Sequence, residues 1–111
     1  MTLYVTISNG LRGCYMPDSC YVAKFTTRCE LKAFIANECS DMREAYGHGG
    51  TKQEISAIAA YAWKMRRNGW QYDLAIGFGR SRAANDRPFG LFLGHATRRE
   101  YSEFLKSESE F

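Results

Sequence analysis

The residues best suited to recognition chemistry are the arginines in GFGRSRAANDRPFG, residues 77–90. This stretch contains Arg80, Arg82 and Arg87 against a single acidic residue. A planar guanidinium group donates paired hydrogen bonds to carboxylates and phosphates, so these residues suit an acidic protein surface or a polyanion. Residues 64–99 hold eight basic and two acidic residues, a balance of +6, whereas the rest of the chain carries −3. The asymmetry predicts a binding region if the fold gathers the charges on one side, and a solvated basic face explains it equally well.

Two tryptophans lie beside this basic region and are candidate anchors for a partner. Arg and Trp are the residue types in which binding energy concentrates at protein interfaces. Trp63 falls outside the expected buried stripe of its helix, although packing under the second strand is an alternative interpretation. The candidate partner-binding residues are Arg80, Arg82, Arg87, Trp63, Trp70, Arg66 and Arg67.

Groups suited to catalysis are sparse, and we expect no enzymatic activity. A nucleophile–base pair would need Cys14 or Cys20 with His48 or His95, and no third group is placed to orient the base. The four cysteines form no CxxC pair, so we expect no metal and no cofactor. The glycines of residues 77–79 lack the third glycine and the crossover helix of a dinucleotide site. A small Cys/His enzyme and a pairing of Cys14 with Cys20 stay open as alternatives.

The elements that position these residues follow from hydrophobic periodicity and capping signals. Alternating and apolar runs predict strands at 2–8, 20–26, 72–78 and 89–95. Three Thr-x-x-Glu sequences, each followed by apolar residues at helical spacing, predict helix starts at Thr27, Thr51 and Thr97. We expect the first helix to stop at Gly47 and the second at Asn68-Gly69. The predicted buried stripes are Leu31, Phe34, Ile35, Cys39 and Met42 in the first helix, and Ile55, Ile58, Ala59, Ala62 and Met65 in the second, with Tyr101, Phe104 and Leu105 presented by the third.

The element order β-β-α-α-β-β-α predicts a single α+β domain over residues 1–111, with 106–111 as a frayed tail. The short connection GHGG favours an antiparallel helical pair. We expect a mainly antiparallel sheet of about four strands with the helices packed on one face, whose strand order the sequence does not reveal. Residues 79–88 would form a ten-residue hairpin loop, with nearby glycines serving as bulges or as points of close backbone approach.

In its size, its β-β-α-α-β-β-α layout and its basic loop GRSRAANDR, the chain resembles small phage-encoded accessory proteins, including anti-CRISPR inhibitors. This resemblance implies a non-catalytic domain that blocks a larger nucleoprotein machine by surface complementarity. It also implies that Arg80, Arg82 and Arg87 meet acidic side chains of the target. Acidic residues along the first helix keep local DNA mimicry open as well, namely Glu30, Glu38, Asp41 and Glu44.

We therefore expect an inhibitor or adaptor whose partner is another protein or a nucleoprotein complex. The alternative is a nucleic-acid-binding protein that uses the basic region 64–99. The chain shows neither a signal peptide nor a run of 18 apolar residues, which predicts a cytoplasmic protein without a membrane partner, in the host cytoplasm if phage-encoded. We expect a monomer or a homodimer.

Overall fold

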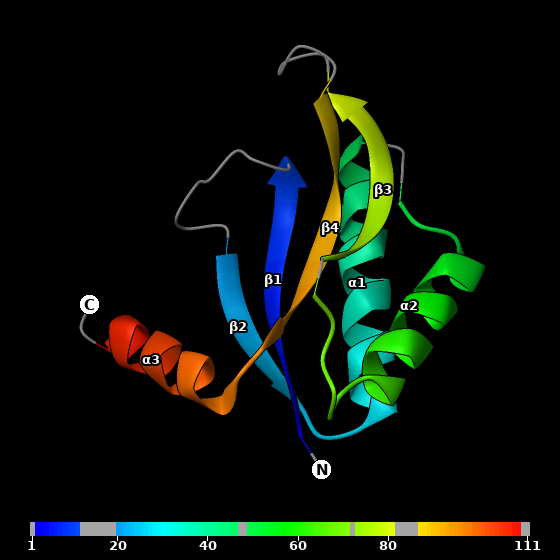
Figure 1. The fold of residues 1–111 in the computed structure, drawn as a ribbon. Helices are drawn as coiled ribbons and strands as arrows, with labels where there is room; N and C mark the ends of the chain where they lie inside the picture. Colours follow the sequence, from blue (N-terminus) through cyan, green and yellow to red (C-terminus); the bar gives the residue numbers. More distant parts are fainter. Residues whose placement is uncertain (1, 12–19, 47–48, 72, 82–86, 110–111) are drawn as a thin grey trace.

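Four strands and three helices follow one another in the order β-β-α-α-β-β-α (Figure 1). The computed structural model describes residues 2–11, 20–46, 49–71, 73–81 and 87–109. The predicted α+β class and element order are confirmed. The elements are β1 (Leu3–Leu11), β2 (Cys20–Phe25), α1 (Arg28–Tyr46), α2 (Lys52–Lys64), β3 (Leu74–Ser81), β4 (Arg87–Ala96) and α3 (Arg98–Ser109).

The strands form one antiparallel sheet in the order β2-β1-β4-β3. Its two central strands come from opposite ends of the chain, since Tyr4 of β1 pairs with Ala96 of β4. On the outer sides, Leu3 pairs with Phe25 of β2, and Leu74 of β3 pairs with Leu93. The pairing of β1 with β4 therefore joins the β1–β2 pair to the β3–β4 pair.

One face of the sheet forms the hydrophobic core with α1 and α2. Leu3, Val5 and Ile7 alternate along β1 and are fully buried. They belong to one cluster with the buried residues of the two helices, which run alongside each other behind the sheet (Figure 1). Burial also raises the pKa of the Cys39 thiol in this cluster. The predicted stripes are confirmed for Leu31, Ile35, Cys39, Ile55, Ala59 and Ala62, with Phe34, Met42 and Ile58 partly buried against them.

The third helix lies against the opposite face of the sheet. Tyr4 stands between the buried residues of β1, so its side chain points away from α1 and α2. Its ring lies 5.3 Å from that of Tyr101 on α3, between ring centroids. The expected placement of helices on one face thus holds for α1 and α2 but not for α3. The helix also continues to Ser109, so residues 106–109 are helical where a frayed tail was expected.

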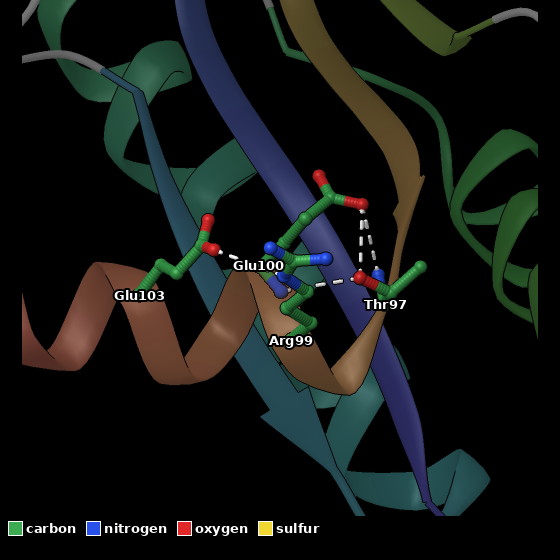
Figure 2. A network of polar contacts seen from close by, with 4 residues as sticks. All are labelled: Thr97, Arg99, Glu100 and Glu103. Atoms are coloured by element: carbon green, nitrogen blue, oxygen red, sulfur yellow. Dashed lines mark hydrogen bonds and ion pairs between the residues drawn. The ribbon is translucent and has the colours of Figure 1, made fainter.

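All three predicted helix starts are found, with two complete capping boxes and one variant. In α2, Thr51 Oγ1 accepts from the Glu54 N–H at 3.1 Å, and Glu54 accepts from the Thr51 N–H at 3.2 Å. Thr97 and Glu100 repeat this arrangement at α3 (Figure 2). At α1, Thr27 accepts from the Glu30 N–H as predicted. The Glu30 carboxylate, however, accepts from the hydroxyl and N–H of Thr26, and these hydrogen bonds lower its pKa.

The hairpin formed by β3 and β4 is paired further toward its tip than predicted. Ser81 pairs with Arg87, so the expected ten-residue loop shortens to residues 82–86, which lie outside the described residues. The register shifts between Gly77 and Gly79, which is a β-bulge. A Cβ on Gly90 would collide with the carbonyl oxygen of Ile76 on the neighbouring strand. The predicted bulge at the glycines of residues 77–79 is therefore confirmed, whereas the close backbone approach occurs at Gly90 on the partner strand.

Candidate functional site

The candidate residues belong to two separate places in the fold rather than to one patch. Arg80 and Arg87 lie in the paired strands near the hairpin tip. Trp63, Arg66 and Arg67 lie where α2 ends, and this segment contacts His95 near the other end of β4. The eight strand positions from Arg87 to His95 correspond to about 26 Å. The condition for a single binding region, that the fold gathers the basic residues 64–99 on one side, is therefore not met by the backbone positions of these residues.

The hairpin arginines are described only through their backbone. Arg80 pairs with Pro88 and Arg87 pairs with Ser81, so both belong to the β-ribbon and not to its connecting loop. Arg82 lies outside the described residues. Recognition by these three side chains stays a prediction.

At the end of α2, an arginine is stacked on a tryptophan. The guanidinium carbon of Arg66 lies 4.8 Å from the ring centroid of Trp63. Its Nη1 donates to the Trp63 carbonyl oxygen at 2.7 Å, so Arg66 also caps the C-terminal end of the helix. Its Nε is buried and has no hydrogen-bond partner among the described residues. The guanidinium group is thus partly removed from water, while most of its N–H groups make no hydrogen bond within the described part of the chain.

Gly69 and Trp70 hold this segment against β4, where both lie beside His95. Gly69 adopts a left-handed backbone conformation with φ +75°, and its N–H donates to the Met65 carbonyl at 2.7 Å. The imidazole of His95 lies directly beside it, with Nε2 3.4 Å from the Arg66 carbonyl oxygen. We call Trp63, Arg66, Gly69, Trp70 and His95 the α2–β4 cluster.

Trp70 completes the cluster from the chain that leads into β3. Its ring meets the imidazole of His95 edge-on, with 5.0 Å between centroids. Its indole N–H donates to the Leu93 carbonyl oxygen at 3.0 Å. Both tryptophans are half-buried and packed against the core, while Tyr61 on the outer side of α2 is 45% exposed. Trp63 is therefore partly packed into the fold and partly exposed.

In the alternative of a Cys/His enzyme, His95 is a candidate base. In the structure, its imidazole contacts a backbone carbonyl oxygen and an indole ring. Cys14 and His48 lie outside the described residues, as does the side chain of Cys20. Across the ranges that the structure describes, no three or more His, Cys, Asp or Glu side chains are grouped to hold a metal ion.

The acidic residues of α1 have unequal surroundings. Glu30 serves the cap of its helix. Glu38 is half-buried, and together with the burial of Tyr21 its charge raises the pKa of that phenol to about 12, burial being the larger cause. Asp41 and Glu44 are exposed. The four carboxylates therefore do not form a uniform surface like that of a nucleic-acid backbone.

Comparison with known proteins gives no relative from which a role could be transferred. No protein-family model, curated protein or solved structure matches the chain. Among the described residues, the helices are too short or too polar to cross a bilayer. The candidate site is therefore argued from its own geometry.

Proposed function

We propose that this protein is a non-catalytic binding domain that recognises an acidic surface on another protein through the end of α2. In that role it acts as an inhibitor or an adaptor of a larger macromolecular complex. The nucleoprotein machines blocked by the small phage inhibitors that it resembles are the first class of target to examine.

The observation that carries this proposal is a group of cations around a stacked arginine. Lys64, Arg66 and Arg67 fall within one turn at the end of α2, and Lys64 and Arg67 are exposed. Within the described ranges, no carboxylate forms an ion pair with Arg66. Complementary charge speeds and orients the docking of two proteins, while a stacked aromatic–arginine pair supplies an ordered centre.

Occupied aromatic rings favour a protein partner over single-stranded nucleic acid. Proteins bind such strands by stacking bases on aromatic side chains. The Trp63 ring is covered by the Arg66 guanidinium, and Trp70 is packed against His95 and bonded to Leu93. The described cluster therefore offers cations but little aromatic surface for a base.

Two variants with the same charge change distinguish the two ends of the sheet. The first changes Lys64, Arg66 and Arg67 to Gln, and the second changes Arg80, Arg82 and Arg87 to Gln. Wild type and both variants are immobilised, exposed to nuclease-treated lysate of the native host, and compared by quantitative mass spectrometry. We expect the first variant to lose a protein that the wild type retains in the absence of nucleic acid.

The remaining outcomes contradict the proposal in different ways. Loss with the hairpin variant alone would move the binding surface to the β3–β4 tip. Unchanged capture by both variants would refute a basic binding surface altogether. Direct titration with a labelled oligonucleotide at low and moderate salt tests the alternative, because phosphate contacts lose orders of magnitude in affinity over that range. Nuclease-sensitive capture together with such a salt dependence would establish nucleic-acid binding instead.

A further inference from the structure

The guanidinium of Arg66 is held in place before any partner arrives. Its Nη1 donates to the Trp63 carbonyl oxygen, and its central carbon lies over the Trp63 ring. The backbone of Arg66 is tied to β4 through the contact of its carbonyl with His95. A side chain ordered in this way loses less conformational entropy on binding than a free surface arginine.

The protein supplies no anion for this group in the described part of the chain. The nearest acidic residue along the sequence is Asp73, seven positions after Arg66. Its carboxylate lies over Gly94, where an added Cβ would come within 2.9 Å of Asp73 Oδ1. Gly94 pairs with Thr6 and faces the side of the sheet away from the helical pair, whereas His95 faces the helical pair. Asp73 is thus turned to the other face of the sheet.

The partial burial of the Arg66 guanidinium strengthens its attraction for an anion that approaches from the solvent. The buried Nε is shielded from water and has no hydrogen-bond partner among the described residues. A guanidinium in such a partly dry setting interacts more strongly with an anion than one in bulk water. The planar fork of Arg66 matches the two oxygens of a carboxylate.

We propose that Arg66, seated on Trp63, receives an Asp or Glu carboxylate from an acidic segment of the partner protein. This inference rests on the proposed function and deepens it, because it names one recognition contact among the three cations. Lys64, an exposed point charge two residues away, adds long-range attraction without a specific geometry.

The test uses decaglutamate as the probe and the two indole N–H signals of the full-length protein in NMR spectra. The chain has two tryptophans, and a Trp63→Phe variant assigns their signals. We expect decaglutamate to shift the Trp63 signal saturably and to leave the Trp70 signal, whose N–H is bonded to Leu93, nearly unmoved.

The matched variants are Arg66→Gln and Lys64→Gln, which remove the same charge from neighbouring positions. A charge-assisted hydrogen bond contributes about 1.5–3 kcal/mol, so Arg66→Gln should weaken decaglutamate binding by about tenfold or more. An exposed ion pair contributes about 0.2–1 kcal/mol, so Lys64→Gln should weaken it by about fivefold at most. Arg66→Lys keeps the charge but not the fork, and we expect an intermediate loss. An unchanged Trp70 signal shows that each variant is folded.

Three results would overturn the inference. The first is an equal loss for Arg66→Gln and Lys64→Gln, and the second is the absence of any Trp63 shift at millimolar decaglutamate. The third is tighter binding of the oligonucleotide dT10 than of decaglutamate with the same dependence on Arg66, which would make this a phosphate site. The first leaves the proposed function intact, because a diffuse basic surface would still bind acidic proteins. Failure of the proposed function itself is detected separately, by lysate capture that both triple variants leave unchanged.

Discussion

Gly69 holds the backbone where the chain turns from α2 toward β3, and its neighbour is the imidazole of His95. Two independent restrictions apply at this position. The φ of +75° is a conformation that residues with a Cβ rarely adopt, and a Cβ there would lie 3.0 Å from His95 Nδ1. The Arg66 carbonyl oxygen contacts Nε2 of the same imidazole at 3.4 Å.

We expect Gly69→Ala to lower the free energy of unfolding by about 1–2 kcal/mol, because the left-handed conformation disfavours a Cβ by that amount. The midpoint of thermal unfolding, measured by circular dichroism, should fall by several degrees. Gly77→Ala is the matched control, since nothing lies within 4 Å of a Cβ there and its φ is ordinary. It should change the stability by less than about 0.5 kcal/mol. Equal losses in the two variants would contradict this account.

Single residues differed in how far the sequence revealed their surroundings. The predicted buried stripe of α2 left Trp63 outside it, and Trp63 is half-buried against the core. The stacking of Arg66 on Trp63 was not predicted, although the two residues are three apart, because stacking depends on how the helix ends. The contact between His95 and Arg66 joins residues 29 positions apart, and no local pattern signals it.

The helix starts show what local sequence determines well. A threonine hydroxyl and a glutamate three residues later satisfy N–H groups within the same turn, so the signal needs no distant partner. The variant at α1 arises because Thr26 also precedes the helix and offers both a hydroxyl and an N–H to Glu30. Both Thr26 and Thr27 precede this helix, and the Glu30 carboxylate accepts its hydrogen bonds from Thr26.

Removing the cap of α2 should weaken the element that carries Trp63 and Arg66. We expect Thr51→Ala to lower the free energy of unfolding by about 1 kcal/mol, measured by urea denaturation, because the Glu54 N–H loses its acceptor. Thr51→Ser retains the hydroxyl and should keep most of the stability. If serine costs as much as alanine, the threonine stabilises the helix by something other than its hydroxyl.

The hairpin of β3 and β4 shows where local reasoning stopped short. Glycine and arginine are not typical strand residues, and GFGRS therefore suggested a loop from Gly79 onward. The bulge between Gly77 and Gly79 takes up one extra residue, and pairing resumes as far as Ser81 and Arg87. Because the partner strand sets this register, the sequence of either strand alone does not determine it.

The molecule as a whole has two unequal sides around its sheet. Among the described residues, the thirteen members of the main core cluster come from the strands, α1 and α2, and none comes from α3. On the other side, α3 rests on the sheet through contacts such as that of Tyr101 with Tyr4, while Leu105 is 48% exposed. We infer that α3 can detach while the core stays closed.

Amide hydrogen exchange measures this difference directly. We expect lower protection in α3 than in α1, β1 and β4. Ile35→Val removes one buried methyl group, at a cost of about 0.5–1.5 kcal/mol, and should accelerate exchange in the core by about two- to tenfold. Exchange in α3 should hardly change, because the core is intact before and after that helix opens. Equal acceleration in α3 would show that the protein opens as one cooperative unit.

The strand order was beyond the sequence for a related reason. Alternation indicated β1 and an apolar run indicated β4, but neither pattern carries information on which strands are neighbours. The same limit applies to the placement of α3, since its apolar residues fit either face. Whether the basic residues gather was equally undetermined, because Lys64 ends α2 whereas Arg87 begins β4, and no local pattern relates the positions of these two elements.

The pairing of β1 with β4 also determines when the sheet can be completed during synthesis. Within the sheet, Tyr4 is made near the start of the first strand, and its partner Ala96 is the last residue of the last strand. On the ribosome, the nascent chain can close the β1–β2 hairpin early, but the other side of β1 has no neighbour until β4 has emerged. The first strand therefore has one open edge from its own synthesis until that of β4, and a chaperone that binds such edges could bind it during this interval.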